Sequence, residues 1–351
     1  MAVYINKITV RSNMSIAKSK EIHLISRPNG EPSEENFLVK EVIVNEVSEN
    51  EVLIKNLWMS VDPYMRGRMI DRKSYVPPFE LGKTLEGGAI GVVIQSKNSE
   101  YKEGDFVNSN FGWREYFTTE GKFLKKINPD IGPLQAYLGT LGMPGMTAYV
   151  GLLRIGELKE GDKVMISAAA GAVGTVASQI AVAKGCEVYG TAGSDEKCLF
   201  LEKDLGITKA INYKTSEHLI KSFHNTCPEG VDVYFENVGG SHLEAALSIM
   251  RPQGRIALCG MIEQYNDTSP RPGPNNLMAA IAKSLKIQGF IVSNHSDLSE
   301  KFLSDMKSWI ESGKMQWKET IDEGIESAPS AFLKLFRGQN FGKMLVKIAD
   351  N

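Results

Sequence analysis

Short apolar runs alternate with helix-like segments through the middle and second half of the chain. The runs that predict strands are residues 164–166, 187–190, 231–235, 255–258 and 285–287. Strands that alternate with helices favour a parallel sheet covered by helices on both faces. This pattern predicts an α/β domain with a doubly wound parallel sheet.

The first ~130 residues follow a different pattern, with apolar runs at 50–56 and 88–94 that are bounded by turn residues and predict strands. Residues 128–133 contain two prolines and a glycine, which suits a domain boundary. Near the C-terminus we expect a helix over 329–336 and a strand over 343–348. We expect this last strand to return to the first, β-rich domain.

A run of small residues at 168–174 joins the strand-like residues 163–167 to a helix-like segment. It reads A-x-x-G-x-x-G and ends in Gly171, Ala172, Val173 and Gly174, with alanine where the dinucleotide-binding fingerprint has its first glycine. Such a turn lets the backbone approach a pyrophosphate at a helix N-terminus. A turn that serves packing alone would look similar, so this motif leaves both interpretations open.

About 20 residues further on, NAD-binding domains carry an acid that binds the ribose 2′-hydroxyl. Here that place is taken by Gly193, followed by Ser194 and, three residues later, Lys197. Ser194 and Lys197 could hold a 2′-phosphate, which favours NADP. Ser194 could also cap the next helix. The acids at 195 and 196 keep NAD possible.

Two further turns close candidate strands, at residues 236–240 and 258–260. Ligands of open α/β sheets lie beyond the carboxyl ends of the strands, so glycines there could face a nicotinamide and its ribose. Ordinary tight turns are the alternative.

Composition narrows the choice of function. The chain has 351 residues and a net charge of −2, which gives no reason to expect a nucleic-acid or anionic-membrane partner. There is no apolar run of membrane-spanning length and no signal-peptide pattern, so we expect a cytoplasmic protein.

Cysteine and histidine are scarce where a zinc alcohol dehydrogenase needs them. Residues 1–185 contain no cysteine, and His23 is the only histidine before residue 200. We therefore expect no metal site of Cys and His ligands in the first domain. The four cysteines form no C-x-x-C pair and are expected to be small core residues. The G-x-S-x-G and P-loop patterns are absent as well.

The chain resembles the medium-chain dehydrogenase/reductases, and in particular their zinc-independent group of prostaglandin, alkenal double-bond and curcumin reductases. The resemblance covers nearly the whole chain and is carried by residues 59–69, 141–149, 168–174, 192–197, 235–240 and 338–343. It implies a β-rich GroES-like catalytic domain, over 1–132 and 315–351, and a six-stranded Rossmann domain over 133–314. It also implies a homodimer.

The resemblance implies roles for individual residues. Lys197, Ser194 and Tyr213 are similar to contacts of the adenosine phosphate end, and Ala172 and Val173 to the pyrophosphate turn. Tyr64 and Tyr265 are similar to residues on the substrate side, although either could simply pack or be solvated. The positions that match the nicotinamide half are Asn237, Cys259, Phe290, Ile291, Val292 and Asn340.

The activity that the resemblance implies is NADPH-dependent reduction of the carbon–carbon double bond of an α,β-unsaturated ketone or aldehyde. Hydride would pass to the β-carbon, and the Tyr265 hydroxyl would stabilise the charge that develops on the carbonyl oxygen. Tyr64 would orient the substrate, and water could protonate the α-carbon. A quinone reductase of the same superfamily and a nucleotide-binding protein without turnover are the alternatives.

Overall fold

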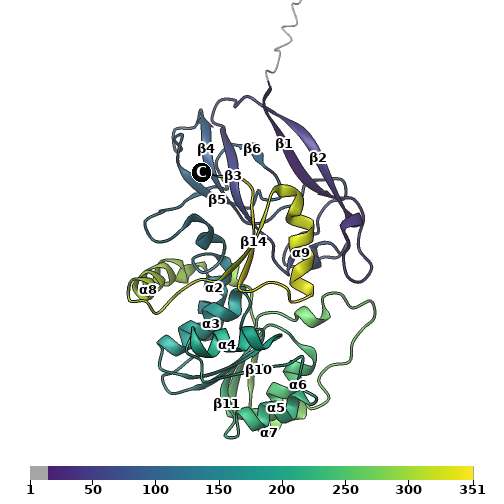
Figure 1. Cartoon of the computed structure of the whole chain (residues 1–351), viewed down its shortest axis with the longest axis vertical. Helices are drawn as coiled ribbons and strands as arrows, with labels where there is room; N and C mark the ends of the chain where they lie inside the picture. The colour runs from purple at the N-terminus through teal and green to yellow at the C-terminus, as the bar shows by residue number, and fades with distance from the viewer. Residues whose placement is uncertain (1–14, 351) are drawn as a thin grey trace, which may run out of the picture.

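The computed structural model describes residues 15–350 as two halves stacked along the long axis of the molecule (Figure 1). One half is built on a six-stranded, fully parallel sheet. The other half contains a seven-stranded sheet and a two-stranded hairpin. The fold is therefore the expected pair of a doubly wound Rossmann domain and a β-rich GroES-like domain.

The parallel sheet has the strand order β10-β9-β8-β11-β12-β13. Its strands are β8 (Lys163–Ile166), β9 (Glu187–Ala192), β10 (Lys209–Asn212), β11 (Val231–Glu236), β12 (Met250–Leu258) and β13 (Lys286–Gly289). The helices of this half are α2 (Met143–Val150), α3 (Ala172–Ala183), α4 (Asp195–Lys203), α5 (Leu219–Thr226), α6 (Gly240–Ile249), α7 (Met278–Ala282) and α8 (Ser299–Glu311).

Successive side chains of a central strand point to opposite faces of the sheet, which explains why helices cover both faces. In β8, Val164 and Ile166 belong to one hydrophobic core, whereas Met165 belongs to another on the opposite face. Residues of α3 share the first core, and residues of α5 and α6 share the second. Because successive strand residues point to opposite faces, an unbroken apolar strand needs helices on both sides.

The β-rich half collects strands from both ends of the chain. Its strands are β1 (Ser15–Leu24), β2 (Phe37–Asn45), β3 (Val52–Ser60), β4 (Ala89–Ser96), β5 (Phe106–Ser109), β6 (Tyr116–Thr119), β7 (Lys125–Lys126), β14 (Glu319–Glu323) and β15 (Lys343–Lys347). Its helices are α1 (Met65–Arg68) and α9 (Ala328–Phe336).

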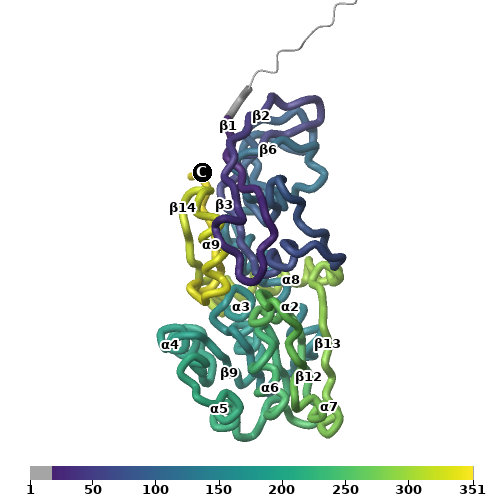
Figure 2. Tube along the Cα trace, turned by 90° about the vertical axis from the view of Figure 1, so that its right-hand side faces the viewer, coloured from purple at the N-terminus to yellow at the C-terminus, as the bar shows by residue number. Residues whose placement is uncertain are grey.

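The end of the chain completes this half. β15 lies between β14 and β3, and it pairs antiparallel with β3. Figures 1 and 2 show β14 and α9, near the C-terminus, beside β3. The expected return of the last strand is thus confirmed. Phe332 of α9 packs edge-on against Trp113 and Phe37 in the core of this half.

Several details differ from the expected elements. β12 begins at Met250 rather than at residue 255. The strands without a predicted counterpart are β1, β2, β6, β7, β10 and β14. β10 and β14 lie at the edges of their sheets. An edge strand tolerates polar residues, so its apolar signal is weak. The boundaries that we predict at 132 and 314 fall between β7 and β8 and between β13 and β14.

Candidate active site

The predicted cofactor residues follow the carboxyl ends of several parallel strands. The strand order reverses between β8 and β11, and ligands of open α/β sheets bind at such a switch point. The glycine turn follows β8, Gly193 follows β9, Tyr213 follows β10, Asn237 follows β11 and Cys259 follows β12. The fold thus brings residues from five strand ends to one edge of the sheet.

The turn after β8 is built tightly enough for a backbone-lined site. Gly171 is the N-cap of α3, and Ala172, Val173 and Gly174 form the first turn of this helix. A Cβ added to Gly174 would lie 2.2 Å from the carbonyl oxygen of Ala168, so only glycine fits. The first turn of a helix leaves N–H groups without intrahelical acceptors, which suits a pyrophosphate.

A segment of the β-rich half lies against this turn. The Gly342 N–H donates to the carbonyl oxygen of Ala170 at 2.9 Å, and Gly342 forms a bridge with Gly171. The Asn340 side chain donates to the carbonyl oxygen of Gly342 at 2.9 Å. Asn340 is therefore held beside the glycine turn, although it comes from the far end of the chain.

A second corner of the site is positively charged. The Ser194 hydroxyl accepts the Lys197 N–H at 3.3 Å, so Ser194 does cap α4. The Lys197 ammonium donates to the carbonyl oxygen of Gly338 at 2.8 Å. A Cβ added to Gly193 would lie 3.0 Å from the Tyr213 hydroxyl oxygen. These residues form one cluster at the ends of β9 and β10.

Lys214 belongs to the same corner, although the sequence did not single it out. A Cβ added to Gly193 would lie 3.3 Å from Lys214 Cε, and one added to Gly338 would lie 4.0 Å from Lys214 Nζ. Burial, together with the nearby Lys214 ammonium, lowers the pKa of Lys197. Two like charges that approach each other in this way would be stabilised by a bound anion.

The end of β11 is fixed by a buried carboxyl group that sequence reasoning also missed. The Ser167 hydroxyl donates to Glu236 Oε1 at 2.7 Å and accepts the Asn237 N–H at 2.7 Å. The Asn237 side chain donates to the Ser167 carbonyl oxygen at 2.7 Å. Glu236 is fully buried, and burial raises the pKa of its carboxyl group. Asn237 is thus rigidly placed.

Cys259 lies at the adjacent strand end, where its N–H donates to the carbonyl oxygen of Glu236 at 2.9 Å. Burial, with a smaller effect of Glu236, raises the pKa of the Cys259 thiol to about 12. The thiol therefore stays protonated near neutral pH and is a poor nucleophile.

Phe290, Ile291 and Val292 follow β13 at the edge of the sheet. The Phe290 ring packs toward Gly151, since a Cβ added to Gly151 would lie 2.8 Å from Phe290 Cζ. Ile291 is the N-cap of a short helical turn that begins at Val292. These three residues lie one strand further from the switch point than Cys259.

Tyr265 lies in the loop after β12 with its hydroxyl toward the strand ends. A Cβ added to Gly260 would lie 3.1 Å from the hydroxyl oxygen, which accepts the Met261 N–H at 3.4 Å. Burial raises the pKa of Tyr265, and Cys259 and Tyr75 add to this effect. The hydroxyl is therefore a hydrogen-bond donor at neutral pH.

Tyr64 comes to the same region from the β-rich half. Burial and the Asp62 carboxylate raise the pKa of Tyr64, and Tyr75 contributes here as well as at Tyr265. Asp62 forms a buried ion pair with Lys343 at 3.0 Å, and the Lys343 ammonium also donates to the carbonyl oxygen of Val61 at 2.9 Å. The segment before Tyr64 is thus anchored to β15.

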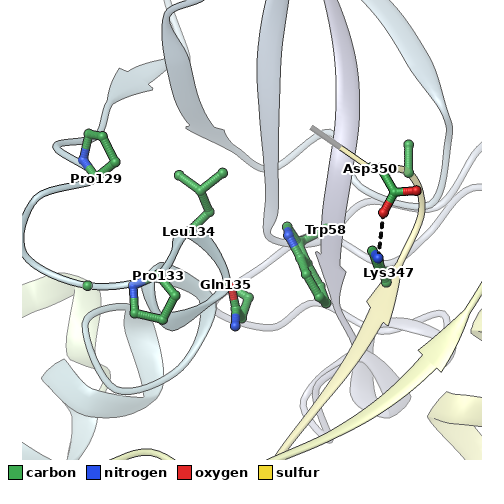
Figure 3. A pocket seen from close by; sticks show the side chains of 9 residues that line it. Trp58, Pro129, Pro133, Leu134, Gln135, Lys347 and Asp350 are labelled. Carbon is green, nitrogen blue, oxygen red and sulfur yellow. Dashed lines mark ion pairs between the residues drawn. The ribbon is translucent and has the colours of Figure 1, made fainter.

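A separate cavity of about 470 Å³ opens on the β-rich half (Figure 3). Trp58, Pro133 and Leu134 line it, with the Lys347–Asp350 ion pair on its far side. None of the predicted site residues is among those that line it.

Within 15–350, no group of three or more His, Cys, Asp or Glu side chains could hold a metal ion. No helix in this range has the length and apolar character needed to cross a bilayer.

Comparison with known proteins extends the picture. Residues 20–127 match the family model of the N-terminal domain of oxidoreductases, and residues 172–308 match that of zinc-binding dehydrogenases. The chain is 46% identical to the protein YfmJ of Bacillus subtilis, over 95% of this chain and 99% of that protein.

Other relatives carry more specific names. The chain is 39% identical to the NADPH-dependent curcumin reductase of Escherichia coli, over 93% of this chain and 96% of that protein. It is 41% identical to the NADP(+)-dependent 2-alkenal reductase of Nicotiana tabacum, over 94% and 98% of the two chains.

A solved structure of CurA from Vibrio vulnificus in complex with NADPH superposes with a TM-score of 0.90. It is 38% identical in sequence and covers 95% of this chain and 100% of that chain. These matches cover 93–95% of this chain and thus extend over both halves. The chain belongs to the medium-chain dehydrogenase/reductase family, in the group that contains the curcumin, prostaglandin and 2-alkenal reductases.

Proposed function

We propose that this enzyme uses NADPH to reduce the carbon–carbon double bond of α,β-unsaturated ketones or aldehydes. The observation that carries the proposal is the meeting, at one sheet edge, of a paired-lysine corner and a half-buried tyrosine with its hydroxyl toward the strand ends. The first suits the extra phosphate of NADPH, and the second suits an oxygen that gains negative charge. The names of the curcumin and 2-alkenal reductases support the same reaction class.

The residues present fit the cofactor. Gly174 leaves room for close helix–strand packing at the pyrophosphate turn, and Gly193 stands where an acid would repel a 2′-phosphate. Lys197, Lys214 and Tyr213 would hold that phosphate. Asn237 and Asn340 would lie along the nicotinamide half. When bound, NADPH supplies the hydride for the β-carbon.

The protein's own contribution is to place and stabilise the substrate. The Tyr265 hydroxyl is protonated at neutral pH, as an ordinary tyrosine is, so it can donate a hydrogen bond to the carbonyl oxygen of the enone as negative charge accumulates there. Tyr64 would orient the substrate from the opposite half. The raised pKa of Cys259 keeps this thiol from adding to the electrophilic substrate.

The test is steady-state NADPH oxidation with a small alkenal, an aryl enone and a benzoquinone. We expect the enone or alkenal to give the highest kcat/KM. Replacing Tyr265→Phe should lower kcat by about 100- to 1000-fold, because it removes one preorganised donor to the oxyanion.

Two outcomes would contradict the proposal. Unchanged enone turnover by Tyr265→Phe would remove this tyrosine from the reaction. A benzoquinone rate above every enone rate would identify a quinone reductase instead.

We also propose that the enzyme is a cytoplasmic homodimer. All four cysteines are free, as expected in a reducing compartment. β13 is an edge strand whose four residues are all exposed. Beside it in the chain, α7 exposes Met278 and Ile281 by 78% and 80%. A second copy would cover this open edge and these apolar side chains.

A further inference from the structure

Arg66 joins the two segments that carry the active-site tyrosines. Its side chain lies at the junction of the halves, and the residue is only 3% exposed. Its Nε donates to Asn266 Oδ1 at 3.0 Å, and its Nη2 donates to the carbonyl oxygen of Gly30 at 2.8 Å. Arg66 is two residues from Tyr64, and Asn266 directly follows Tyr265.

Arg66 is not an efficient stabilising residue. Its Nη1 is buried and has no hydrogen-bond partner among the described residues. Burial, with a contribution from Arg72, lowers the pKa of its guanidinium. A buried charge with an unpaired donor adds less stability than a well-packed apolar residue of similar size. This cost fits a role in geometry better than a role in stability.

Each tyrosine segment has its own anchors within its half. The segment of Tyr64 is held by the ion pair between Asp62 and Lys343. The loop that carries Tyr265 is braced internally by Arg271, which pairs with Glu263 and Asp267 of the same loop, with its Nη2 donating to Asp267 Oδ1 at 2.9 Å. The Arg66–Asn266 bond connects these two anchored segments, so it sets where one lies relative to the other.

We infer that Arg66 is a positioning residue, which holds the Tyr265 hydroxyl in register with Tyr64 through Asn266. This inference rests on the proposed function, because it assumes that Tyr265 stabilises the reacting oxygen. A displacement of about 1 Å can lower a rate about 100-fold, so loss of this bond should weaken catalysis without touching the cofactor corner.

A double-mutant cycle on the full-length enzyme tests this. Arg66→Met should lower kcat roughly 10- to 100-fold, whereas the Kd for NADPH, measured by fluorescence titration, should stay within about 3-fold. In the Arg66→Met background, Tyr265→Phe should cost less than about 10-fold, because the displaced hydroxyl contributes little. In the parent enzyme the same change should cost about 100- to 1000-fold.

The control is Arg27→Met in the same half. Arg27 also donates to two carbonyl oxygens, those of Met69 and Phe79, both at 3.1 Å, but among the described residues none of its hydrogen bonds reaches the loop that carries Tyr265. The fold-losses of kcat caused by Arg27→Met and by Tyr265→Phe should multiply in the double variant, because the two residues act independently. If Arg66→Met fails to fold, Asn266→Leu takes its place in the cycle, and Asn266→Asp, which keeps the acceptor oxygen, should restore most of the loss.

The outcomes distinguish a failure of the positioning role of Arg66 from a failure of the proposed enone reductase function. If the fold-losses of kcat caused by Arg66→Met and by Tyr265→Phe multiply fully in the double variant, the positioning role is wrong and the proposed function stands. If the parent enzyme turns over no enone, the proposed function is wrong. If Tyr265→Phe has no effect in a parent enzyme that does reduce enones, the positioning role is wrong and the reduction proceeds without Tyr265.

Discussion

Lys197 and Lys214 point two ammonium groups at the same small region around Gly193 and Gly338. Burial and the positive charge of Lys214 both lower the pKa of Lys197. The Lys197 ammonium donates to the carbonyl oxygen of Gly338, which is a neutral acceptor. A dianionic phosphate would relieve the repulsion and replace a weak acceptor by a strong one. Selectivity between NADPH and NADH should therefore depend on Lys214 as well as on Lys197.

Lys214→Gln should weaken NADPH binding by about 10- to 100-fold, because one charge-assisted hydrogen bond is lost. NADH binding should change much less, since NADH lacks the 2′-phosphate. Isothermal titration with both cofactors, and with adenosine 2′,5′-bisphosphate, measures this difference. Lys203→Gln, at the exposed end of α4, is the matched control. Equal losses for NADPH and NADH would exclude Lys214 from the phosphate site.

The role of an individual residue was predictable from the sequence where it depends on residues that are close by in the sequence. The cap at Ser194 is confirmed, because a serine before two acids is a local signal. Glu236, Lys214 and Arg66 were not identified, because their partners lie far away in the sequence. Arg66 and Asn266, for example, are 200 positions apart. No periodicity or motif reports such a contact.

At the scale of elements, the central strands β8, β9 and β11 were predicted because they are mostly buried on both faces and hence rich in apolar residues. β10 and β14 were missed for the opposite reason. β14 reads Glu-Thr-Ile-Asp-Glu at the edge of its sheet, so little of it enters the core. The junction of β8 with α3 was found from its small residues alone.

The tight turn at Gly174, between β8 and α3, leads to a prediction about the stability of the protein. Gly174→Ala would place a methyl group 2.2 Å from a backbone oxygen, and the backbone of β8 and α3 would have to shift. We expect the free energy of unfolding to fall by roughly 1–3 kcal/mol, measured by urea denaturation. Gly273→Ala is the control, because a Cβ there meets nothing within 4 Å. Equal stabilities of the two variants would show that the turn is not tight.

At the scale of the whole molecule, the proposed cofactor site belongs to neither half alone. The Rossmann half supplies the strand ends, and the segment from Gly338 to Gly342 of the other half lies on the glycine turn. The sequence indicated both halves and the return of the last strand. It did not indicate how closely that returning segment approaches α3, because the bridge between Gly171 and Gly342 depends on the packing of the halves.

The proposed dimer is testable at this scale. Changing Met278→Glu and Ile281→Glu together should produce a monomer, because two charges would enter an apolar contact. Light scattering coupled to size-exclusion chromatography gives the mass of each species. Phe123→Glu, at an equally exposed apolar position on the β-rich half, should leave a dimer. A monomeric parent protein would rule the proposal out.

The position of β15 between β14 and β3 has a consequence for biosynthesis. A ribosome releases the six parallel strands before it releases β15, so the Rossmann half can fold while the β-rich half still lacks a central strand. During that interval residues 58–60 of β3, which β15 covers in the complete fold, offer an uncovered hydrogen-bonding edge, which is a template for mispairing. The half that emerges first is the one that matures last.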